Sequence, residues 1–167
     1  MKTLMELLPL AIVVVVMGAG TWFLLTREWA IGPWLLAGLL FAHGWVHLMF
    51  VFPQPDPAAA GSTAWPFDMG GSWLIGGAGL DIGLVRTVGM ALMVVVFAGF
   101  TLAALASVGV VVPAGWWAGL VVVSAAGSLV LLTMFMSPLF LLGYAIDLAL
   151  LWLVFASVWS PTGIGIP

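Results

Sequence analysis

A series of long apolar segments limits the fold of this chain more than any other feature. A membrane-spanning helix needs about 20 predominantly apolar residues, and the sequence offers such runs at 4–25, 33–52, 84–108, 115–136 and 138–158. Inside hydrocarbon every backbone N–H and C=O must be satisfied within the protein, which favours helices. We therefore predict an all-α fold: a polytopic transmembrane helical bundle of about five transmembrane helices.

The composition agrees with a protein of the membrane interior. Hydrophobic residues make up 65% of the chain and charged residues 5%, whereas a soluble domain carries about 25% charged residues. The run at 4–25 resembles a signal peptide, but its length fits a retained span better than an apolar signal core of about 7–15 residues. We expect a multi-pass protein of the cell membrane, surrounded by the lipid bilayer.

Charge and cysteine content exclude several function classes. The basic residues are Lys2, Arg27 and Arg86, too few for a nucleic-acid surface. The chain has no cysteine, which excludes disulfides, thiolate metal sites and iron–sulfur clusters within it. No G-x-S-x-G elbow occurs. No complete catalytic constellation is visible, so we do not expect a stand-alone enzyme.

The chain is expected to form one integral membrane domain over residues 1–167, with one long connection. Residues 53–83 are rich in proline and glycine and predict an extramembrane loop. Loops beyond about 12–15 residues are usually functional or disordered, so this loop is a candidate cap over a site. The tryptophans Trp116, Trp117, Trp152 and Trp159 are expected to be interfacial or lipid-facing anchors.

The two histidines of the chain, His43 and His47, lie one helical turn apart in the segment 33–52. Ionisable residues inside a membrane are costly and mark functional sites by default. Counting 1.5 Å per residue from the loop end of each helix places His43, Ser128 and Asp147 in one layer about 12–14 Å deep. Tyr144 shares a helix face with Asp147. We predict a buried polar layer of these residues.

One reading of this layer is a transition-metal site. His-x-x-x-His presents two imidazoles on one helix face, so His43, His47 and Asp147 are the predicted metal ligands. A further ligand would come from Asp68 or Glu6.

Two other cofactors also fit the layer. A single histidine would ligate a haem or chlorophyll, and a quinone would take hydrogen bonds from imidazole, carboxyl and phenol groups. The predicted cofactor-binding residues are His43, His47, Tyr144 and Asp147. The identity of the cofactor stays open between a metal, a pigment and a quinone.

A structural role is the competing interpretation. A buried histidine and aspartate can satisfy each other and fix how two helices dock. Ser124 and Ser128 have no nucleophile motif around them and are expected to serve helix packing. The leading prediction is a small membrane subunit that holds a cofactor in a redox assembly. The alternative is an accessory subunit without a cofactor, whose Trp-rich surface binds other membrane proteins or a second copy of the chain.

Four short motifs stand out along the chain: WLLAGLLFAHGWVHLMF at 34–50, Arg86-Thr87-Val88-Gly89, Pro113-Ala114-Gly115-Trp116-Trp117, and Gly143 to Asp147. They resemble motifs of DoxX-like membrane proteins, and more closely those of a related group of small bacterial multi-pass proteins with an HG-x-x-H-L pattern. That resemblance spans about residues 34–158. It implies a four-helix core, here preceded by an N-terminal helix, and an accessory role in membrane redox chemistry and quinone reduction.

Overall fold

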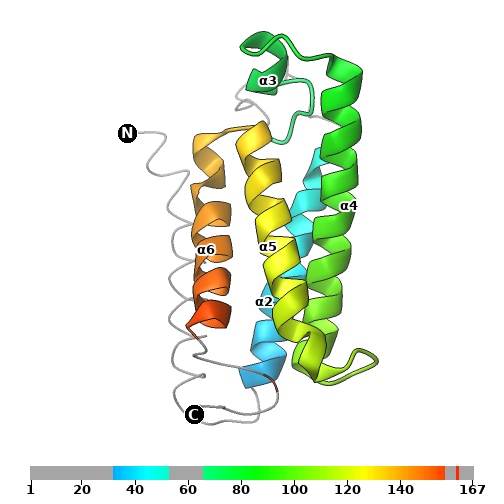
Figure 1. The fold of residues 1–167 in the computed structure, drawn as a ribbon, viewed down its shortest axis with the longest axis vertical. Coiled ribbons are helices and arrows are strands. Elements are labelled where there is room, and N and C mark those ends of the chain that lie inside the picture. Colours follow the sequence, from blue (N-terminus) through cyan, green and yellow to red (C-terminus); the bar gives the residue numbers. More distant parts are fainter. Residues whose placement is uncertain (1–31, 53–65, 157–160, 162–167) are drawn as a thin grey trace, which may run out of the picture.

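The computed structural model describes residues 32–52, 66–156 and 161 (Figure 1). The predicted N-terminal helix at 4–25 lies outside them, as does the first part of the predicted loop.

All regular secondary structure in the described part of the chain is helical. Its elements are α2 (Gly32–His47) with η1 (Leu48–Phe50), α3 (Trp73–Gly76), α4 (Ile82–Ser107), η2 (Ala114–Trp116) with α5 (Trp117–Met134), and η3 (Pro138–Phe140) with α6 (Leu141–Phe155).

Four of these segments are long and apolar enough to cross a membrane: Gly32–Phe50, Ile82–Ser107, Ala114–Met134 and Pro138–Phe155. The all-α class and the multi-pass architecture are thereby confirmed, and these four spans agree with the predicted ones to within a few residues.

The long helices form an up-and-down bundle (Figure 1). α4 packs against both α2 and α5, and α5 packs against α6. The short helix α3 lies at the end of the bundle where α2 finishes and α4 starts. The links from α4 to α5 and from α5 to α6 are short, and antiparallel packing of consecutive helices buries their faces against one another in a bilayer.

Two clusters of buried side chains fill the bundle. One is centred on Leu40, Phe100 and Val121, and the other, toward the loop end, on Phe50 and Phe135. The segment from α2 to η1 buries one face, which carries Leu36, Leu40, His43, His47 and Phe50. Side chains at i, i+3, i+4 and i+7 share a helix face.

Trp117 departs from the sequence prediction. It was expected to face lipid or the interface, but its side chain is only 1% exposed, whereas its neighbour Trp116 is 65% exposed. Adjacent residues on a helix point about 100° apart, so the pair divides between the outside and the core. Trp117 packs in the same cluster as Val121.

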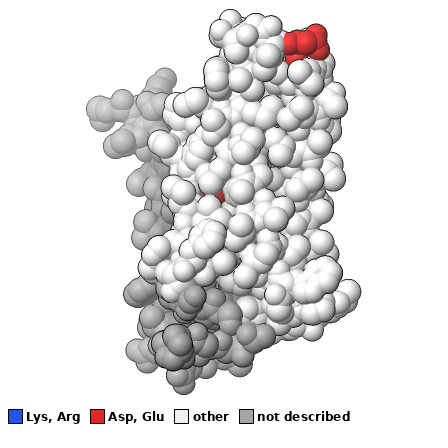
Figure 2. All heavy atoms as spheres, in the orientation of Figure 1, with Lys and Arg blue, Asp and Glu red and all other residues white. Residues whose placement is uncertain are grey.

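The outer surface suits hydrocarbon rather than water. Large apolar side chains such as Val94, Val123, Leu148 and Phe155 are exposed. Figure 2 shows one face of the molecule that is almost entirely uncharged, with acidic atoms gathered at the end where α4 begins. Exposed apolar belts of this extent mark contact with lipid or with other membrane proteins.

Candidate functional site

Four polar side chains meet inside the bundle: His43 and His47 of α2, Ser128 of α5 and Asp147 of α6. Ser128 and Asp147 are 0% exposed, His47 is 2% exposed and His43 is 6% exposed. Buried polar groups are costly unless each finds a partner, and these four find one another. We call this set the polar network.

The contacts of the polar network close a ring. His43 Nε2 lies 2.8 Å from Asp147 Oδ1. Asp147 Oδ2 lies 2.5 Å from Ser128 Oγ, and Ser128 Oγ lies 2.8 Å from His47 Nε2. His47 Nδ1 donates to the backbone oxygen of His43, one turn earlier in α2, at 2.9 Å. The ring therefore ties α2, α5 and α6 together at one level.

Gly44 lets α2 lie close enough to α4 to place His43. A β-carbon at Gly44 would lie 3.0 Å from Cβ of Phe100 and 3.7 Å from Cα of Phe97. The absence of a side chain permits this approach. The His43 ring consequently packs edge-on against Phe100, with ring centroids 4.9 Å apart, while its Nε2 turns to Asp147.

A second glycine brings α5 close to α4 near the network. A β-carbon at Gly99 would overlap Oγ of Ser124. Ser124 lies one turn before Ser128 and is equally buried, but its hydroxyl donates to the backbone oxygen of Leu120 at 2.7 Å. Ser124 is thus a packing residue, as the sequence predicted.

The structure brings together the three residues predicted as metal ligands, His43, His47 and Asp147. It also adds Ser128, which the depth count placed in the same layer but which was assigned to helix packing. Ser128 would have been identified as a member of the site if every polar residue at the depth of a buried carboxylate had been treated as a candidate partner.

The hydroxyl of Tyr144 makes a contact outside the polar network. Its hydroxyl lies 3.0 Å from Oγ1 of Thr133, in an exposed contact. Its assignment to a cofactor stays a prediction.

The polar network does not resemble an open metal site. Both nitrogens of His47, Nε2 of His43 and both carboxyl oxygens of Asp147 already have partners inside the network. Within the described residues there is no group of three or more His, Cys, Asp or Glu side chains arranged to hold a metal. Asp68 accepts from the backbone N–H of Gly70 at 2.7 Å, and Glu6 lies outside the described residues.

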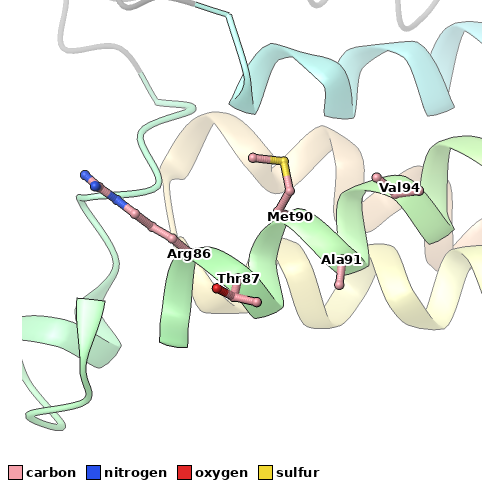
Figure 3. A pocket seen from close by; sticks show the side chains of 5 residues that line it. All are labelled: Arg86, Thr87, Met90, Ala91 and Val94. Atoms are coloured by element: carbon pink, nitrogen blue, oxygen red, sulfur yellow. The ribbon is translucent and has the colours of Figure 1, made fainter. Parts of the chain in front are cut away.

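No lysine or arginine neutralises Asp147 within the part of the chain that the structure describes. The only such residue there is Arg86, and it lines a surface groove of about 630 Å³ with Thr87, Met90, Ala91 and Val94 (Figure 3). An exposed arginine at the polar end of an apolar helix face is typical of the membrane interface. The charge balance of the network therefore depends on its own histidines.

Comparisons of the chain with known protein families, curated proteins and solved structures found no match. The functional interpretation therefore depends on the geometry of the polar network and on the residues that form it.

Proposed function

We propose that this chain is a small subunit of a redox assembly in the cell membrane, and that its polar network serves a membrane quinone. The observation that carries this proposal is the hydrogen-bonded ring of His43, His47, Ser128 and Asp147, buried inside a bundle of membrane-spanning helices. Quinone reduction and oxidation require protons as well as electrons, and imidazole and carboxyl groups are the side chains that exchange protons near neutral pH.

A quinone fits the network better than a metal ion held by both histidines does. A metal ion that is bound through histidine needs a free lone pair on an imidazole nitrogen. His43 Nε2 and both nitrogens of His47 are already hydrogen-bonded, which leaves at most Nδ1 of His43 to ligate a metal or a pigment. A quinone head group needs only a hydrogen-bonding edge. His43, the member of the network with the largest exposed fraction, is the residue that we expect it to contact.

The resemblance of residues 34–50 to DoxX-like proteins supports the same class of function, because that family is linked to quinone reduction through accessory subunits. In such an assembly the exposed apolar side chains, Trp152 among them, would contact partner membrane proteins as well as lipid.

The test measures which cofactor the purified protein contains. We would isolate the chain from its native membrane in mild detergent, extract and quantify quinone, and measure metals by elemental analysis. The proposal predicts about one quinone per chain and no stoichiometric metal. His43→Ala is expected to lower bound quinone at least tenfold, whereas Ser124→Ala, a buried serine of α5 outside the network, is expected to retain it.

Other outcomes overturn the proposal in distinct ways. Stoichiometric metal that disappears in His43→Ala would make the histidines ligands after all. If the wild-type protein contains neither metal nor quinone, the structural role is the interpretation that remains.

That structural role is the second candidate, and a specific observation favours it: the network joins α2 to both α5 and α6. Asp147→Asn separates the two roles. The amide keeps the size of the carboxyl group, accepts from His43 Nε2–H and donates to Ser128. A purely structural network should tolerate it, while quinone chemistry that needs an exchangeable proton should slow by at least tenfold.

A further inference from the structure

We propose that the polar network holds one mobile proton, which moves between Asp147 and His47 through the hydroxyl of Ser128. This inference deepens the proposed function and rests on it for its biological use, because a quinone at the network would draw on this proton. The position of the proton can be measured without any quinone, so the two proposals fail separately.

The ring contains four contacts, and each of them needs one hydrogen. The backbone oxygen of His43 can only accept, so His47 Nδ1 must carry a hydrogen. Ser128 has one hydroxyl hydrogen but two partners, Asp147 Oδ2 and His47 Nε2. The hydrogen for the other of these two contacts must therefore come from Asp147 or from His47.

With His43 donating from Nε2 to Asp147 Oδ1, two arrangements satisfy all four contacts. In the first, protonated Asp147 donates from Oδ2 to Ser128, which donates to the neutral His47 ring. In the second, the His47 imidazolium donates from Nε2 to Ser128, which donates to the Asp147 carboxylate. Both arrangements contain the same hydrogens and the same heavy-atom contacts, and both have a net charge of zero.

One double transfer converts the first arrangement into the second. The bond from Asp147 Oδ2 to its hydrogen breaks and a new O–H bond forms on Ser128 Oγ. The original hydroxyl hydrogen of Ser128 leaves to form the N–H bond on His47 Nε2. Ser128 ends as it began, and no electrons are gained or lost. The two O···O and O···N distances, 2.5 Å and 2.8 Å, are hydrogen-bonding distances that such a transfer requires.

A simple ion pair of His43 and Asp147 does not complete the ring. If His43 is the only charged imidazole and Asp147 is ionised, the one hydroxyl hydrogen of Ser128 goes either to Asp147 or to His47. The other of these two contacts, at 2.5 Å or 2.8 Å, then has no hydrogen between its atoms. Buried lone pairs without a donor cost about 1–3 kcal/mol. The sequence-based idea of an isolated His–Asp pair is therefore incomplete for this geometry.

The low dielectric of the bundle favours arrangements with no net charge. Removing the mobile proton would leave an anion, and the described residues place no lysine or arginine in contact with Asp147. An uncompensated charge inside hydrocarbon is strongly unfavourable. The proton is thus retained by the network while its position within the network is free to change.

The test uses the full chain in lipid vesicles, labelled with ¹⁵N-histidine. Because the chain has only two histidines, nitrogen NMR reads the protonation of each ring, with a His43→Gln sample to assign them. Infrared difference spectra against Asp147→Asn read the carboxyl group. We expect neutral His47 with protonated Asp147, imidazolium with carboxylate, or a mixture of these two states.

Variants then test the path. Asp147→Asn should fix His47 as a single neutral ring with hydrogen on Nδ1, because the amide donates toward Ser128. In a Ser128→Ala background, Asp147→Asn should no longer change the His47 signals. In the matched Ser124→Ala background, the response should match that of the wild type.

Two results would overturn the proposal. One is an ionised Asp147 beside a neutral His47 in the wild-type protein, a measurement that needs no variant. The other is a His47 signal that still responds to Asp147→Asn when Ser128 is replaced by alanine.

Discussion

Asp147 of α6 and His43 of α2 lie 104 positions apart in the sequence, yet their side chains form a 2.8 Å hydrogen bond inside the bundle. This contact matters most for α6, whose buried residues are Asp147 and Leu150 alone. A helix that buries so few side chains depends on polar contacts to fix its rotation and depth. We therefore expect the polar network to fix the position of α6, whatever further function the network has.

A double-mutant cycle measures that docking. His43→Ala and Asp147→Ala are each expected to lower the free energy of unfolding in detergent by about 1–2 kcal/mol, since hydrogen bonds between membrane helices contribute about 0.6–1.7 kcal/mol. The double variant should lose less than the sum of the two single losses, because the contact can be removed only once. Reversible unfolding followed by circular dichroism gives these values.

The control for this cycle is Leu148→Ala, next to Asp147 but 58% exposed on the lipid side. It should change the unfolding free energy by less than about 0.5 kcal/mol. Strict additivity of His43→Ala and Asp147→Ala would show that their hydrogen bond contributes nothing to docking.

Two glycines of α2 provide a second prediction. A β-carbon at Gly44 would lie 3.0 Å from Cβ of Phe100, whereas one at Gly38 would have no atom within 4 Å. Gly44→Ala should push α2 away from α4 and lower stability by about 1–3 kcal/mol, the usual range for overpacking. Gly38→Ala should be neutral or stabilising by about 0.5–1 kcal/mol, because alanine favours the helix.

The measurement compares the thermal midpoints of the two variants in one detergent. An equal fall of the thermal midpoint in both variants would mean that the close approach of α2 and α4 does not depend on Gly44. The Gly44→Ala variant should also weaken the hydrogen bond of His43, visible as a changed ¹⁵N signal of that ring, while Gly38→Ala leaves the signal in place.

The sequence predicted the long helices because hydrocarbon leaves the backbone few choices, and apolar length alone identifies the spans. Depth along each helix was also predictable, since the rise per residue is constant. For that reason His43, Ser128 and Asp147 were placed in one layer, and the contacts among them agree with that placement.

Rotation of each helix was harder to predict than depth. In an almost uniformly apolar helix no amphipathic pattern marks the buried face. Trp117 was therefore expected outside and lies in the core, and the hydroxyl of Tyr144, a residue expected on the same face as Asp147, contacts Thr133. The role of Ser128 depends on the rotation of α5 about its own axis, and only the three-dimensional packing of the helices shows that rotation.

The loop before α4 is fastened to the end of α5, which gives a third prediction. Ser72 Oγ donates to the backbone oxygen of Met134 at 2.5 Å, and Trp73 Nε1 donates to that of Thr133 at 2.8 Å. These carbonyls belong to the last turn of a helix, where they have no partner within the helix. Trp73→Phe keeps the ring but removes one donor, so α3 should open more often.

Hydrogen exchange measures this opening. Amides near α3, such as Ile75 N–H, which donates to Ser72 O, should exchange about 3–10-fold faster in Trp73→Phe, as expected for the loss of about 1 kcal/mol. The control is Trp116→Phe. Trp116 is an exposed tryptophan just before the first residue of α5, at the opposite end of that helix from α3, so this variant should leave exchange at α3 unchanged. Equal exchange in both variants would contradict a tether through Trp73.

The turn between α4 and α5 contains a strained residue, which leads to the last prediction. Val111 has a positive φ of 65°, and the N–H of Val112 donates to the backbone oxygen of Val110 at 2.6 Å, which together describe a γ-turn centred on Val111. A positive φ costs a residue with a β-carbon about 1–2 kcal/mol, and a branched side chain is especially unfavourable there. The Val111 side chain is 91% exposed, so little packing offsets this cost.

Val111→Gly should therefore raise the free energy of unfolding by about 0.5–1 kcal/mol, because the relief of strain exceeds the added backbone entropy of glycine, about 0.5–1 kcal/mol. Val110→Gly, one position earlier and without a positive φ, carries the entropy cost alone and should lower stability. Unfolding of both variants in the same detergent decides the matter: if Val111→Gly destabilises the protein as much as Val110→Gly does, Val111 does not hold this conformation in the folded protein.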